Sequence, residues 1–182
     1  MSPRIKLLLI IFVMVSPVFA SYLTYYFWRP ANSVNYGELL PTKPLPLAQL
    51  QNIGSENIEA VKGKWILLTV DSGTCDTTCK DKLYLIRQIR TAQGKHMDRI
   101  ARALVVDDNS QPTPEVMKDY AGTVVLKGNS QLLSLLPTNG GLHDHVFLID
   151  PLGNLVLRYP LNPNPKKMIK DLTRLLSVSN IG

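Results

Sequence analysis

Cysteine is scarce in this chain, whose 182 residues contain only Cys75 and Cys79. A hydrophobic content of 45% is nevertheless enough for an ordinary buried core without a network of disulfides. No internal repeat is evident, which argues against a repeat architecture. No dense run of Lys and Arg is interleaved with aromatic residues either. Nucleic acid is therefore not an expected partner.

The formal net charge of +6 belongs in part to the N-terminal segment. Arg4, Lys6 and Arg29 flank an apolar run, and beyond them 17 basic residues face 14 acidic ones. The rest of the chain is therefore only mildly basic.

Charge is almost absent from the segment between Ile5 and Trp28, where Lys6 is the only charged residue. This run is long enough to cross a bilayer core of roughly 30 Å as a helix. Aromatic residues crowd its far end, as in a membrane interface: Tyr25, Tyr26 and Trp28. Basic residues at its near end favour a cytoplasmic N-terminus. The sequence predicts a cytoplasmic N-terminus and transmembrane anchor over residues 1–29.

A cleaved signal peptide is the alternative interpretation of this segment. Val18-Phe19-Ala20 has part of the small-residue pattern of a cleavage site, and Pro17 could break the helix before it. In both cases the remainder is exported. In a bacterium we expect a single-pass inner-membrane protein whose C-terminal domain lies in the periplasm, where cysteines can be oxidised.

Proline, Asn and Ser are dense in residues 30–46, which suits an extended tether and not a packed element. The folded domain is expected over residues 47–182. Its apolar runs predict strands and helices in the order β-α-β-α-β-α-β-β-α, with strands at residues 65–70, 101–106, 123–126, 146–150 and 154–159. Strands that alternate with helices and end in a hairpin predict an α/β, thioredoxin-like fold.

Cys75 and Cys79 lie between the first predicted strand and a helix-like run at residues 82–89. A structural disulfide is one interpretation, but a bridge that closes so short a loop removes little unfolded-state entropy. Thiols at the start of a helix have a lowered pKa, which favours redox chemistry or metal binding. Redox pairs typically have two intervening residues, and here there are three. Two thiolates would suit Cu(I), and an added imidazole would also accommodate Cu(II).

Three histidines could supply that imidazole. His96 lies in a basic loop and is expected to be a surface residue. His143 and His145 lie directly before a predicted strand, in a loop that a thioredoxin-like layout brings beside the cysteines. Asp144 could orient one of the two rings. Both histidines are candidate metal ligands, and the sequence leaves the choice between them open.

At these positions the sequence resembles the SCO/SenC family, the membrane-tethered copper chaperones of cytochrome c oxidase assembly. The resemblance spans roughly residues 63–159 and includes several segments in order: Gly63–Leu68, Cys75-x-x-x-Cys79, Val106–Asn109, Thr113–Tyr120, Leu126–Ser130, Asp144-His145 and Leu148–Gly153. Lys80 stands where the family usually has Pro, so the chain resembles a divergent member.

The resemblance implies a metallochaperone, and so not primarily an enzyme, that holds copper through Cys75, Cys79 and His143 or His145. Its partner would be a cytochrome c oxidase subunit or another assembly factor. An alternative is a periplasmic thiol–disulfide reductase that uses Cys75 and Cys79 as a redox-active pair to keep metal-ligand cysteines of an oxidase subunit reduced. A third alternative is a tethered scaffold in oxidase assembly with vestigial chemistry.

Overall fold

The computed structural model describes residues 2–27, 35–137, 140–179 and 181. Residues 35–182 cluster as one unit and α1 (Pro3–Phe27) belongs to another. Within α1 an 18-residue window has a mean hydropathy of 2.3 and none of it is buried, which suits a single membrane span or a signal sequence. The helix continues through Pro17.

The domain is built on a seven-stranded sheet in the order β1-β7-β6-β3-β4-β5-β2. Strands β3 (Trp65–Asp71), β4 (Ile100–Val106) and β5 (Thr123–Lys127) are parallel. The hairpin of β6 (Val146–Ile149) and β7 (Asn154–Tyr159) joins β3 in antiparallel orientation. The predicted α/β, thioredoxin-like fold is confirmed.

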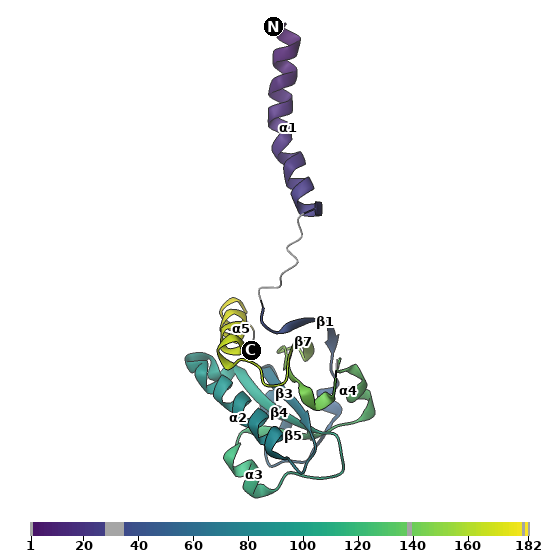
Figure 1. The fold of residues 1–182 in the computed structure, drawn as a ribbon, viewed down its shortest axis with the longest axis vertical. Helices are drawn as coiled ribbons and strands as arrows, with labels where there is room; N and C mark the ends of the chain where they lie inside the picture. The colour runs from purple at the N-terminus through teal and green to yellow at the C-terminus, as the bar shows by residue number, and fades with distance from the viewer. Residues whose placement is uncertain (1, 28–34, 138–139, 180, 182) are drawn as a thin grey trace. The chain divides into compact units, whose positions relative to one another are not determined.

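Both faces of the sheet are covered. Helices α2 (Thr77–Ala92) and α5 (Pro165–Val178) pack on one face, while α4 (Ser130–Leu135) and the segment after β1 cover the other (Figure 1). Strand β4 shows why two faces form: Ile100, Leu104 and Val106 join the α2 side, and the alternate residues join the other. Such continuous burial explains the unbroken apolar runs of the sequence.

The shorter helices begin at side-chain caps. Thr113 accepts the backbone N–H of Val116 and so caps α3 (Pro114–Asp119), and Pro114 occupies its first position. The apolar face of α5 is buried, with Met168, Leu172 and Leu176 in the core. Short 3-10 turns, none of them predicted, complete the chain at Leu47–Gln49, Ile58–Val61, Gly94–Arg99 and Leu142–Asp144.

The structure differs from the expected tether over residues 30–46. Residues 30–34 lie outside the described part of the chain, but Glu38–Pro44 form β1, which pairs with β7. Proline is tolerated there because β1 is an edge strand, and the register shifts between Leu39 and Lys43, around Pro41. A second unpredicted strand, β2 (Gln51–Asn52), pairs with β5 at the opposite edge.

Candidate functional site

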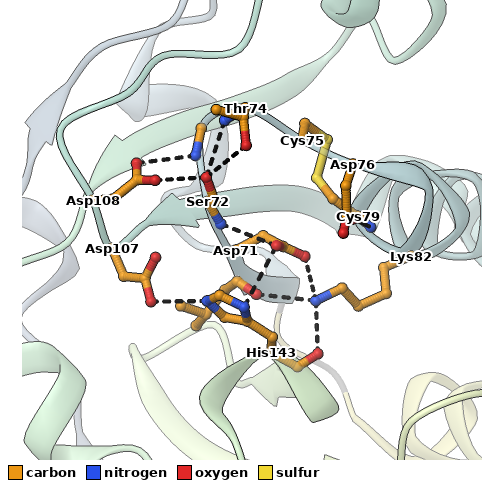
Figure 2. A network of polar contacts seen from close by, with 12 residues as sticks. Asp71, Ser72, Thr74, Cys75, Asp76, Cys79, Lys82, Asp107, Asp108 and His143 are labelled. Atoms are coloured by element: carbon orange, nitrogen blue, oxygen red, sulfur yellow. Dashed lines mark hydrogen bonds and ion pairs between the residues drawn. A yellow bond between two sulfur atoms is a disulfide. The ribbon is translucent and has the colours of Figure 1, made fainter.

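The two cysteines lie where β3 gives way to α2. Cys75 precedes the helix and Cys79 is its third residue, and the two form a disulfide with a Cα–Cα distance of 5.0 Å (Figure 2). Asp76 caps the helix by accepting the N–H of Cys79 at 2.9 Å. Helix α2 thus begins between the cysteines and includes the second of them.

The backbone at Cys75 adopts an uncommon conformation. Its φ of 43° lies in the left-handed region, which residues other than Gly rarely adopt. Its N–H donates to the carbonyl of Ser72 at 3.1 Å and closes a tight turn. Such conformations persist where the surroundings fix them, and they are frequent at functional sites.

A carboxylate from the neighbouring loop holds this turn. Asp108 accepts the Ser72 hydroxyl at 2.5 Å and the Gly73 N–H at 3.1 Å. Hydrogen bonds to its carboxylate hold the pKa of Asp108 well below its usual range. The bond from the Ser110 hydroxyl has the largest effect, and those from Ser72 and Gly73 come next. Gly73 allows the close approach, because a Cβ there would lie 2.4 Å from the carbonyl oxygen of Ser110. The cysteine turn and the loop after β4 are therefore held together.

A buried ion pair lies beside the turn. Lys82 Nζ is 2.6 Å from Asp71 Oδ2, and the side chains of both residues are at most 7% exposed. The same ammonium donates to the carbonyl of Val70 at 3.0 Å and to that of His143 at 2.7 Å. Lys82 therefore connects α2, the end of β3 and the histidine loop.

His143 lies between two carboxylates. Its Nε2 is 2.8 Å from Asp107 Oδ2, and its Nδ1 is 3.7 Å from Asp71 Oδ1. Figure 2 shows the ring turned toward these aspartates, with the disulfide beyond Asp71. The side chain is 44% exposed, so it remains partly open to solvent.

His145 points into the core. The residue is 8% exposed, its Nδ1 lies 3.3 Å from the carbonyl oxygen of Tyr159, and its ring packs edge-on against Phe147. Its Nε2 is buried and has no hydrogen-bond partner among the described residues. The residue directly precedes β6, so the alternation of that strand turns it to the side of Phe147.

The predicted ligand set is therefore only partly brought together. Two sulfurs are adjacent, but both are used in the disulfide, and a thiolate is the form that binds metal. In the part of the chain that the structure describes, no group of three or more Cys, His, Asp or Glu side chains is arranged to hold a metal ion. The soft sulfur pair fits copper once reduced, but His143 would have to leave its carboxylates to join it.

Several residues of the site were not among the predicted site residues, among them Asp71, Lys82 and Asp107. A signal for each was present. Asp71 and Asp107 stand at the carboxyl ends of adjacent parallel strands, where side chains meet at one edge of the sheet. Lys82 lies beside the apolar positions of α2, at Leu83 and Ile86, where a lysine requires a buried partner.

Similar folds occur in solved structures. ScoI of Bradyrhizobium japonicum with copper bound is 22% identical, covers 74% of this chain and 99% of its own, and has a TM-score of 0.51. Yeast Sco1 with copper bound is 15% identical, covers 81% and 96%, and has a TM-score of 0.56. BsSco, a member of the Sco family of cytochrome c oxidase assembly proteins with an identified disulfide switch, is 16% identical, covers 81% and 98%, and has a TM-score of 0.50.

At such low identities these likenesses show the fold alone. No curated protein matches the chain. A family model described as the transmembrane-like, thioredoxin-like C-terminal domain matches residues 65–179, from the first residue of β3 to one residue past α5. The chain belongs to this family of thioredoxin-like domains.

Proposed function

We propose that Cys75 and Cys79 are a redox-active pair that exchanges electrons with a partner protein's disulfide. The observation that carries this proposal is the disulfide itself, formed at the N-terminus of α2 directly after the central strand β3. The positive end of a helix stabilises a thiolate, which is the nucleophile in exchange.

The reaction balances without another cofactor. In the reduced protein one thiolate attacks a sulfur of the partner's disulfide, forms a mixed disulfide and releases the partner's first thiolate. The second cysteine then attacks the mixed disulfide and releases the partner's second thiolate. The protein is oxidised by two electrons and the partner is reduced by two, while the thiol protons pass to solvent or to the leaving thiolates.

Access to the sulfurs is part of the proposal. In the disulfide state Cys75 is 2% exposed and Cys79 is 1% exposed. A partner therefore reaches them only after the cysteine turn opens locally. The Asp108 contacts to Ser72 and Gly73 are the interactions that such opening would break.

We further propose that α1 remains as an anchor in the bacterial inner membrane, with its N-terminus in the cytoplasm. Arg4 and Lys6 at its start favour this orientation. The domain would then lie in the periplasm. Cytochrome c oxidase assembly is the expected setting, since BsSco is described as belonging to a family of oxidase assembly proteins.

A redox titration tests the proposed exchange. The full chain is equilibrated in dithiol buffers of graded potential, free thiols are alkylated, and the reduced fraction is counted by mass. We expect one two-electron transition, about 30 mV per tenfold change in ratio, with a midpoint above roughly −300 mV. A pair that stays oxidised well below that potential would be a structural disulfide, and the proposal would fail.

Copper binding is the second candidate, with Cu(I) as cargo. Two observations favour it: Cys-x-x-x-Cys places two soft sulfurs at the start of α2, with Cα atoms 5.0 Å apart, and the histidine loop is joined to α2 through Lys82. The two copper-bound neighbours hold copper in a similar fold. In this proposal Cys75 and Cys79 bind the ion as thiolates, and a histidine completes the site.

An anaerobic Cu(I) titration of the reduced full chain, with X-ray absorption to count ligands, tests this candidate. We expect one ion per chain with two sulfur ligands. His143→Ser should weaken binding, because this ring is partly exposed, whereas His145→Ser should not, because that ring is buried against Tyr159. Fewer than two bound sulfurs would leave electron exchange as the function of the pair.

A further inference from the structure

The first residues of the folded domain contact α5, the last helix of the chain. The backbone N–H groups of Tyr36 and Gly37 donate to the two carboxylate oxygens of Asp171, at 3.0 and 2.8 Å. Asp171 is 5% exposed and lies in the middle of α5. One buried carboxylate thus binds the first residues of the domain to this helix.

The Tyr36 side chain strengthens the attachment. Its hydroxyl accepts the N–H of Asn164, the N-cap of α5, at 3.0 Å. Lys167 Nζ lies 5.2 Å from the ring centroid, within the range of a cation–π contact. Gly37 packs closely below, since a Cβ there would lie 2.7 Å from the Tyr159 ring. The entering chain is therefore fixed against the N-terminal half of α5.

The outer surface of α5 carries charge of one sign. Its exposed charged residues are all basic: Lys166, Lys167, Lys170 and Arg174. Its only acidic residue is Asp171, which is buried against the entering chain. Helix α3 by contrast carries both signs, with Glu115, Lys118 and Asp119, and α4 carries no charged residue.

Given the membrane anchor proposed above, on which this inference rests, we propose that this basic surface of α5 binds anionic phospholipid headgroups. Residues 28–34 are the only residues between α1 and Asn35, and a chain of that length spans at most about 28 Å. After these residues the chain enters the domain against α5, the helix that carries the basic surface. Weak attraction then suffices, because a tether converts binding into an intramolecular event.

Anionic lipid suits this surface for a physical reason. Lysine and arginine near a membrane are attracted to acidic headgroups, and the attraction falls off within a Debye length of about 8 Å at physiological salt. Four cations on one exposed helix face can approach a flat surface together. The domain would then be held with α5 against the membrane.

The test uses the full chain in nanodiscs of phosphatidylcholine, with or without phosphatidylglycerol. A fluorophore is attached at S177C on the exposed side of α5 and is quenched by nitroxide-labelled lipid. A matched label at L152C, on the exposed β6–β7 turn, is the control. We expect quenching at position 177 to rise in anionic discs and to fall with added salt, and quenching at position 152 to stay unchanged.

Charge removal makes the test specific. Each substitution among K166Q, K167Q, K170Q and R174Q should lower the ratio of lipid-bound to free domain by roughly fivefold. Equal quenching in both kinds of disc, or quenching that needs an added acidic protein, would overturn the inference. A chain that fails to co-purify with discs would overturn the anchor as well, whereas loss of thiol exchange would leave this result untouched.

Discussion

Replacing Cys79 with Ser is expected to stop repeated thiol–disulfide exchange while still allowing one attack on a partner. Exchange needs two thiols on one chain, because the second releases the mixed disulfide that the first forms. With Cys79 absent, Cys75 should remain covalently bound to the partner, and turnover should fall below one event per chain. Mass spectrometry of the trapped adduct and an assay of repeated disulfide reduction measure the two effects.

The matched control is Thr77→Ser, which changes an exposed side chain between the two cysteines and leaves both sulfurs in place. It should keep full turnover. Cys79→Ser also removes the disulfide. Because the bridge closes so short a loop, the chain-entropy model predicts that its loss lowers the free energy of unfolding by roughly 2 kcal/mol. Repeated turnover by Cys79→Ser would contradict the proposed pair. Unchanged oxidase activity in cells that carry both Cys→Ser substitutions would favour a scaffold.

The parts of the fold that could be predicted are those with a local signal. The run Trp65–Val70 predicts β3 because both of its faces are buried, and Thr113-Pro114 predicts the start of α3 because cap and first-turn residues are specific. Strands β1 and β2 could not be predicted in this way. Each exists only through pairing with a distant strand, and Pro41 and Pro44 in β1 argue locally against a strand.

The site shows the same limit. The spacing of Cys75 and Cys79 predicts a working pair of sulfurs, but nothing in the sequence separates His143 from His145. Their different positions follow from where β6 begins: His145 adjoins the strand and turns inward, while His143 lies in the preceding 3-10 turn and meets two carboxylates. The position of Lys82 depends on a tertiary contact with Asp71.

Lys82→Met is expected to be the most destabilising of the single substitutions considered, at about 3–5 kcal/mol in the free energy of unfolding. Removing the ammonium would leave the Asp71 carboxylate buried without its counter-charge. It would also leave the carbonyls of Val70 and His143 without this donor, and so loosen the histidine loop. Urea unfolding of the full chain, followed by a signal from the domain, measures the loss.

Lys80→Met is the matched control, because Lys80 lies two residues earlier in α2 but is exposed. It should change stability by less than about 0.5 kcal/mol. The double variant Lys82→Met with Asp71→Asn should recover part of the loss, since no unpaired buried charge then remains. Equal stability of the two lysine variants, or strictly additive losses in the double variant, would mean that this ion pair does not hold the cysteine turn and the histidine loop together.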